Sequence, residues 1–191
     1  MRREFGWAAV YVILCFFCLG VGQSALATAD GLLLYGNAGQ VHLKNSRSPG
    51  GYGQAGWGVK KGAFLWAGTI SSRRFINYKP KENSLKSYTL DLESLGFEVE
   101  ARQGSLSFIV TADVGRVTTE IEESTRRDPF YGVQVGVGVC FFRNDFIRLH
   151  GRLGAFQIMP HKGLREDLGF GRIDGGFVAI GMDLAEPEKD F

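Results

Sequence analysis

The sequence predicts an all-β fold, an antiparallel up-and-down barrel of eight strands, and three observations lead to this prediction. Apolar and polar residues alternate with a period of two along most of the chain. Glycine, which supplies 27 of the 191 residues, recurs in the turns between the alternating segments. Tight turns alternate with longer polar loops along the chain, which is the connectivity of an up-and-down barrel.

The overall composition excludes several other classes of protein. The 22 Lys and Arg residues nearly balance the 20 Asp and Glu residues, so there is no bulk positive charge for binding nucleic acid. Hydrophobic residues make up 45% of the chain, which is too much for an intrinsically disordered protein. Three cysteines cannot form a disulfide framework.

The first 27 residues have the features of a secretory signal peptide. Arg2 and Arg3 give a positively charged start, and an apolar run follows from Trp7 to Gly22. Ala25 and Ala27 then supply the small residues that a signal peptidase recognises. The run is shorter than the roughly 20 residues that a membrane-spanning helix needs. We therefore expect cleavage after Ala27, and a single barrel domain over residues 28–191.

The strand that starts at Phe130 shows the alternation most clearly. Its small even-numbered residues are expected to face the interior, and its apolar odd-numbered residues are expected to face lipid: Tyr131, Val133, Val135, Val137, Val139 and Phe141. The ten residue steps from Tyr131 to Phe141 span roughly 33 Å at about 3.3 Å per residue. With a tilt of about 40°, this length projects to roughly 25 Å, the height of the apolar band between the aromatic girdles of a membrane barrel.

Extending the alternation in both directions gives eight predicted strands: Gly31–Lys44, Gln54–Lys60, Ala63–Asn77, Ser87–Arg102, Ser105–Glu122, Phe130–Arg143, Asp145–Met159 and Phe170–Leu184. The predicted tight turns lie around Gly62, Gly104 and Asn144, and the longer loops cover residues 45–53, 78–86, 123–129 and 160–169. In strand Ser87–Arg102 the apolar residues change parity halfway. A β-bulge near Glu93–Ser94 would return both sets to one face.

This pattern resembles the small eight-stranded outer-membrane barrels of Gram-negative bacteria, the group that contains the outer-membrane protein A transmembrane domain and the opacity-type and adhesin-like barrels. The resemblance covers residues 28–191 and rests on architecture. It implies export to the outer membrane, insertion by the barrel assembly machinery, a monomer, and contact with outer-membrane lipids and lipopolysaccharide. Many members end on a phenylalanine, as this sequence does at Phe191, although a polar run separates Phe191 from the alternating strand.

The interior of the predicted barrel carries charged side chains. Arg148, His150 and Arg152 share one face of a strand, and a turn centred on Asn144 would put Gly138 beside His150. The same register would put Gly136 beside Arg152. Buried charges need partners, so we expect a luminal salt-bridge network that contains Arg148, His150, Arg152, Glu98, Glu100 and Asp183, with Asp113 and Asp174 as further candidates.

The sequence favours a protein without catalytic activity, with a structural role in the envelope or a role in surface interactions. A basic group around the second long loop is the candidate for contact with lipopolysaccharide phosphates, and it comprises Arg73, Arg74, Lys79, Lys81 and Lys86. The three histidines lack the spacing of metal ligands, so no metal or cofactor is expected.

Three alternative functions stay open. A lipid A deacylase needs a serine two residues after its histidine, but Arg152 follows His150 at that spacing. A narrow ion-conducting channel would need space inside a barrel whose interior eight strands just allow side chains to fill. A soluble ligand-binding barrel would turn the apolar face inward and leave the row of glycines facing water.

Overall fold

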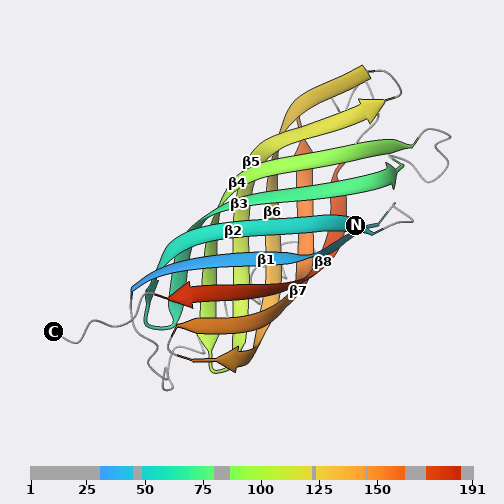
Figure 1. The fold of residues 1–191 in the computed structure, drawn as a ribbon. Coiled ribbons are helices and arrows are strands. Elements are labelled where there is room, and N and C mark those ends of the chain that lie inside the picture. Colours follow the sequence, from blue (N-terminus) through green and yellow to red (C-terminus); the bar gives the residue numbers. More distant parts are fainter. Residues whose placement is uncertain are drawn as a thin grey trace, which may run out of the picture.

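The computed structural model describes residues 31–44, 49–79, 87–121, 124–144, 146–161 and 171–185, which form a closed barrel (Figure 1). Each strand pairs antiparallel with its neighbours in sequence, and β1 pairs with β8 to close the barrel. The strands are β1 (Gly31–Leu43), β2 (Gly50–Lys61), β3 (Phe64–Tyr78), β4 (Tyr88–Gln103), β5 (Leu106–Ile121), β6 (Ser124–Arg143), β7 (Ile147–Pro160) and β8 (Ile173–Ala185). The predicted eight-stranded antiparallel barrel is confirmed.

Two predictions fall on residues that the structure does not describe, namely the signal peptide with its cleavage residues Ala25 and Ala27, and the terminal Phe191. Within the described part of the chain, no helix is long and apolar enough to cross a membrane.

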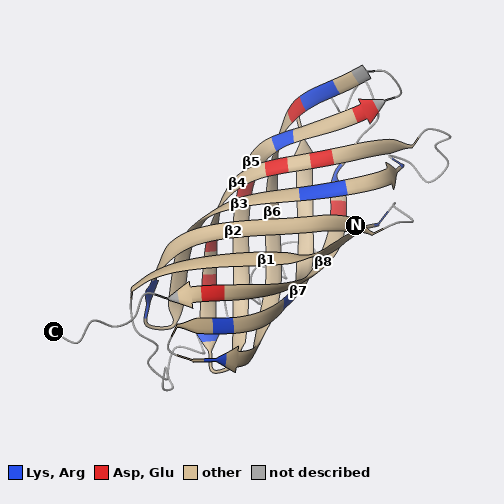
Figure 2. Cartoon of the chain, in the orientation of Figure 1, with Lys and Arg blue, Asp and Glu red and all other residues tan. Residues whose placement is uncertain are grey.

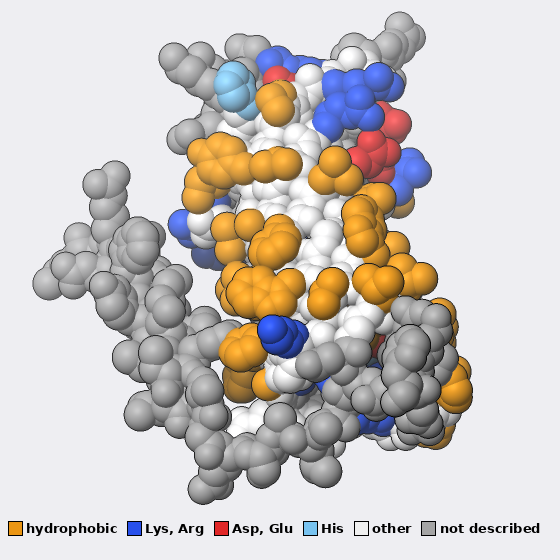
Figure 3. Space-filling view, turned by 90° about the vertical axis from the view of Figure 1, so that its left-hand side faces the viewer, with side chains coloured by type: hydrophobic (Ala, Val, Ile, Leu, Met, Phe, Trp, Pro, Cys, Tyr) orange, Lys and Arg blue, Asp and Glu red, His pale blue; other side chains and the backbone are white. Residues whose placement is uncertain are grey.

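The outer surface of the barrel is apolar, and this follows directly from the alternation along each strand. On β6 the predicted lipid-facing residues all point outward: Tyr131 and Phe141 are 57% and 62% exposed, Val133 and Val139 are exposed, and Val135 and Val137 are half-buried. Other strands add Leu34, Trp57, Trp66, Ile70, Leu95, Phe97, Val114, Leu153, Val178 and Ile180 to the same surface. Hydrophobic side chains therefore cover the middle of the molecule, with charged side chains near its upper rim (Figure 3).

Tight turns connect the strands at one end of the barrel. Gly62 and Gly104 have φ angles of 57° and 59°, in the left-handed region that glycine adopts without strain. In the β6–β7 turn, the Asn144 side-chain oxygen accepts hydrogen bonds from the backbone N–H groups of Phe146 (3.0 Å) and Ile147 (2.7 Å). This is an Asx-type turn, which asparagine forms readily. We call this end the tight-turn end and the opposite one the loop end.

Two strands are longer than the sequence predicted. β2 starts at Gly50 rather than Gln54, and its 12 residues make a full crossing. β6 starts at Ser124, so the predicted loop 123–129 is wrong and only residues 122–123 separate β5 from β6. Proline is tolerated at position 129 because its nitrogen points toward β7, which ends here, so no hydrogen bond to β5 is lost. Its carbonyl points the same way and accepts a hydrogen bond from His161 N–H (2.9 Å).

The predicted bulge near Glu93–Ser94 is also wrong. The pairing of β4 with β3 and with β5 runs through both residues without a register shift. Tyr88, Leu90 and Leu92 instead point into the interior, where Leu90 and Leu92 are fully buried. The change of parity in the sequence marks a change in the lining of the interior, from polar at the tight-turn end to apolar at the loop end.

The register between β6 and β7 differs from the prediction by two residues. Gly138 lies opposite Arg152, Cys140 lies opposite His150, and Gly136 lies opposite Gly154. The turn lies beyond Asn144, which shifts the pairing by three residues, and a bulge at Phe141 reduces the shift to two. The principle behind the prediction holds, since glycines still make room for large interior groups. The Phe177 ring packs on Gly136 and Gly154, where a Cβ on Gly154 would meet Phe177 Cε1 at 2.6 Å.

Replacing Gly154 with alanine is expected to destabilise the barrel by about 1–3 kcal/mol, because the new methyl group would overlap the Val135 carbonyl oxygen and the Phe177 ring. Gly53→Ala is the matched control, since a Cβ there meets no atom within 4 Å. Removing a strand glycine at such an open site is expected to be neutral or slightly stabilising. Urea unfolding of the refolded variants measures both effects, and equal midpoints would contradict this account of the glycines.

Candidate functional site in the barrel interior

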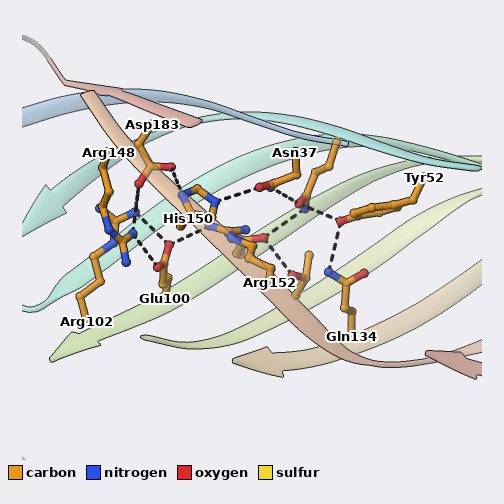
Figure 4. Close-up of polar contacts among 12 residues, drawn as sticks. Asn37, Tyr52, Glu100, Arg102, Gln134, Arg148, His150, Arg152 and Asp183 are labelled. Atoms are coloured by element: carbon orange, nitrogen blue, oxygen red, sulfur yellow. Dashed lines mark hydrogen bonds and ion pairs between the residues drawn. The ribbon is translucent and has the colours of Figure 1, made fainter. Parts of the chain in front are cut away.

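The interior contains a continuous network of polar side chains to which every strand contributes (Figure 4). It extends from Arg102 near the tight-turn end to Arg73 and Asp113 near the middle of the barrel. The residues of this interior network are Asn37 of β1, Tyr52 and Gln54 of β2, Arg73 of β3, Glu98, Glu100 and Arg102 of β4, Thr111 and Asp113 of β5, Gln134 of β6, Arg148, His150 and Arg152 of β7, and Asp183 of β8.

Glu100 is the centre of the charged part of this network. Its carboxylate accepts hydrogen bonds from three arginines, at 2.9 Å from Arg102, 3.2 Å from Arg148 and 2.8 Å from Arg152. Asp183 lies 2.8 Å from Arg102 and 3.1 Å from Arg148, and so joins two of the same arginines from the opposite side. Because these carboxylates are almost completely buried, the pairs are shielded from solvent and held in fixed geometry.

His150 connects the charged groups to a chain of amides. Its Nε2 lies 2.9 Å from Asn37 Oδ1 and its Nδ1 lies 3.5 Å from Asp183 Oδ1. Because the Asn37 oxygen can only accept, Nε2 carries the hydrogen of this contact. Asn37 Nδ2 donates to Gln54 Oε1 (2.9 Å), and Gln54 Nε2 donates to Glu98 (3.1 Å). Gly181 lies directly behind this contact, where a Cβ would overlap both Asn37 and His150.

Arg73 belongs to the interior, which corrects its prediction as a lipopolysaccharide contact. Its side chain is 2% exposed and donates to Asp113 (2.9 Å) and to Gln134 (2.9 Å). Its guanidinium carbon also lies 5.2 Å from the centre of the Phe156 ring, a cation–π distance. The alternation along β3 indicates this interior position, because Trp66, Ile70 and Arg74 have the outward parity and Arg73 has the inward one.

The structure brings together all six residues predicted for the luminal charge network, Glu98, Glu100, Arg148, His150, Arg152 and Asp183. It adds Arg102 and Arg73, which the sequence analysis did not assign to the network, and it includes Asp113, one of the two further candidates. The other candidate, Asp174, instead pairs with the exposed Arg172 (2.9 Å). Four arginines and four carboxylates therefore meet in the interior, and their formal charges cancel.

Above this network, toward the loop end, an apolar cluster fills the interior. Its members include Phe75, Tyr78, Tyr88, Phe130, Phe156, Ile158, Ile173 and Phe177. Phe75 and Phe156 lie with ring centres 6.3 Å apart, and both side chains are buried. Such a filled interior suits eight strands, whose barrel is just wide enough for side chains.

The remaining predicted lipopolysaccharide contacts have different environments. Arg74 is exposed on the outer surface and lies 3.4 Å from Asp91, and Lys79 is half-buried at the end of β3. Lys81 and Lys86 lie outside the described residues. Arg116, which was not predicted, is exposed on the same side and pairs with Glu93 (2.9 Å). Charges of both signs thus occupy the loop ends of β3 to β6 (Figure 2).

The described residues contain no group of three or more His, Cys, Asp or Glu side chains arranged to hold a metal ion. The interior network instead consists of arginine, carboxylate and amide groups already paired with one another. Its chemistry is that of a structural cross-link between strands.

A closed barrel of eight antiparallel strands with an apolar outer belt and a filled interior is the architecture of the small outer-membrane barrels. Similar solved structures are Neisserial surface protein A (12% identity, TM-score 0.49, covering 81% of this chain and 96% of that one) and the N-terminal β-barrel domain of Pseudomonas aeruginosa OprF (12%, 0.47, 81% and 99%). The attachment invasion locus protein of Yersinia pestis, Ail, is similar at 10% identity and a TM-score of 0.43 (81% and 97%). No protein-family model and no curated protein matches the chain.

Replacing Glu100 with glutamine is expected to destabilise the barrel by about 3–5 kcal/mol, because three buried arginines lose their shared counter-charge. Glu93→Gln is the matched control, since it breaks the exposed Arg116 pair and is expected to cost less than about 1 kcal/mol. Urea titrations followed by far-UV circular dichroism measure both free energies of unfolding. Similar losses in the two variants would show that the interior network contributes little to stability.

Proposed function

We propose that this protein is an integral barrel of the bacterial outer membrane that forms no pore and catalyses no reaction, and that supports the envelope or presents its loop end to the surroundings. The observation that carries the proposal is the belt of exposed apolar side chains around the barrel. A belt of this kind is stable in hydrocarbon and would be a liability in water.

The boundary of the belt supports this location. On β4 the outward residues change from Phe97 and Leu95 to Glu93, and on β5 they change from Val114 to Arg116. The charged surface begins at a similar height on the two neighbouring strands, since Leu95 pairs with Val114 and Glu93 pairs with Arg116. Such an abrupt change from apolar to charged side chains is expected where hydrocarbon gives way to head groups.

The filled interior supports the absence of a pore. The ion-paired arginines lie toward the tight-turn end, and the aromatic cluster lies toward the loop end, so a solute would meet a barrier in each half. The outward-facing charges at the loop end, Arg74 and Arg116 among them, are the candidates for contact with lipopolysaccharide phosphates. Each also has a carboxylate neighbour, Asp91 beside Arg74 and Glu93 beside Arg116.

Substituting arginine for Val137 tests the membrane location. Val137 lies near the midpoint between Tyr131 and Phe141, so a cation there is expected to destabilise the inserted barrel by about 2–4 kcal/mol. Thr125→Arg is the matched control, because Thr125 has the same outward parity on the same strand but lies beyond the belt, where the cost is expected to be about 0–1 kcal/mol. Reversible urea titrations in lipid vesicles measure both. Equal costs would contradict insertion at this depth.

A conductance measurement tests the proposed lack of a pore. The purified protein in a planar bilayer is expected to give no discrete, solute-selective current steps, because side chains occupy the interior in both halves.

A comparison of lipid A from cells with and without the protein tests the proposed lack of catalysis, and unchanged acylation is expected. Reproducible current steps would support a channel, and loss of an acyl chain would support the deacylase alternative.

A further inference from the structure

A cavity of about 320 Å³ opens at the tight-turn end and is framed by three turns. The β2–β3 turn contributes Lys60, Gly62 and Ala63; the β4–β5 turn contributes Arg102, Gly104 and Ser105; the β6–β7 region contributes Cys140, Phe141, Phe142, Arg143 and Arg148. Four of these residues are cations, and no carboxylate belongs to the described lining. The cavity is therefore electropositive.

The arrangement of the cations indicates an anionic occupant. Arg143 and Arg148 lie directly opposite each other in the β6–β7 pairing. Like charges at directly opposed positions repel and destabilise a sheet. Glu100 and Asp183 neutralise Arg148 from the interior side, but both are already shared with Arg102. An anion between Arg143 and Arg148 would remove the repulsion.

A second observation points the same way. Arg148 is 8% exposed, yet its Nη2 is buried without a hydrogen-bond partner, while its Nη1 donates to Glu100 and Asp183. Buried polar groups normally have partners, and a guanidinium presents its donors as a planar fork that suits phosphate oxygens. Lys60, which is 4% exposed and lines the same cavity, adds a further positive charge.

We propose that this cavity binds a phosphate group, with three of the cations that line it, Lys60, Arg143 and Arg148, as its ligands. The phosphate is either that of an anionic phospholipid or a free phosphate. The turns of the barrel itself define the site, so the proposal does not rest on the function proposed above. Phe141 and Phe142 lie at its rim and are 62% and 49% exposed, which suits the acyl chains of a lipid whose head group enters the cavity.

Calorimetric titration of the full chain, refolded in a nonionic detergent, tests the site with three probes: inorganic phosphate, dihexanoyl phosphatidic acid and dihexanoyl phosphatidylcholine. Saturable binding of phosphatidic acid, with much weaker binding of phosphatidylcholine, is expected. Phosphatidic acid that binds at least about tenfold more tightly than inorganic phosphate identifies the lipid as the source, and equal affinities identify phosphate alone. Either result supports the site. Absence of binding by both phosphate compounds, or equal binding of the two lipids, would overturn it.

Two variants locate the binding. Arg143→Gln and Lys60→Gln each remove one charge from the cavity and are expected to weaken binding about tenfold, the usual effect of losing one charge-assisted hydrogen bond. Lys44→Gln is the matched control, because Lys44 is exposed at the loop end, far from the cavity, and this variant is expected to bind as the unmodified chain does. Arg143 is exposed, so its replacement leaves the fold intact even if that of the buried Lys60 does not. Unchanged affinity in Arg143→Gln would overturn the assignment.

Discussion

The structure depends on the neutralisation of charge inside a barrel too narrow to admit much water. Eight strands enclose an interior that side chains just fill, and this chain places four arginines in that space. An unpaired buried charge costs several kcal/mol. Each carboxylate must therefore lie within reach of the arginines around it. This requirement also constrains the register of the strands that carry the two partners. Glu100 is central to this neutralisation, because it contacts three guanidinium groups from two strands.

The network also explains why the two halves of the interior differ so sharply. Charged and amide groups are concentrated where each can reach partners on several strands. Aromatic and aliphatic side chains fill the interior toward the loop end, where β3, β4 and β7 contribute Phe75, Leu90 and Phe156. Tyr52 joins the two halves, because its hydroxyl donates to Gln54 (2.9 Å) while its ring lies 5.6 Å from the ring centre of Phe177. The glycines of the interior are the counterpart of these large side chains, since they leave the space that the rings and guanidinium groups occupy.

Sequence patterns predicted the strand number, the closed antiparallel fold and most interior charges, because side-chain parity is a local property of each strand. They failed where the answer depends on the neighbouring strand. The partner of Gly138 could not be read from β6 alone, since one bulge at Phe141 changes the pairing beyond it. The bulge predicted near Glu93 assumed that apolar residues always face outward, an assumption that fails for Tyr88, Leu90 and Leu92. Arg73 was assigned to a surface because a basic residue near a loop usually lies there, although its parity indicated the interior.

The extra length of β6 leaves a stretch of sheet edge that no described strand covers on one side. Residues 124–128 pair with β5, but β7 ends at Pro160, opposite Phe130, so no described strand covers their other side. An open edge of this kind invites strands from other molecules to add to it. This stretch carries Arg126, Arg127 and Asp128 and is followed by Pro129, which has no N–H to offer a new strand. Charge and proline together make the hairpin a poor template for aggregation, so it can project from the barrel without joining one molecule to the next.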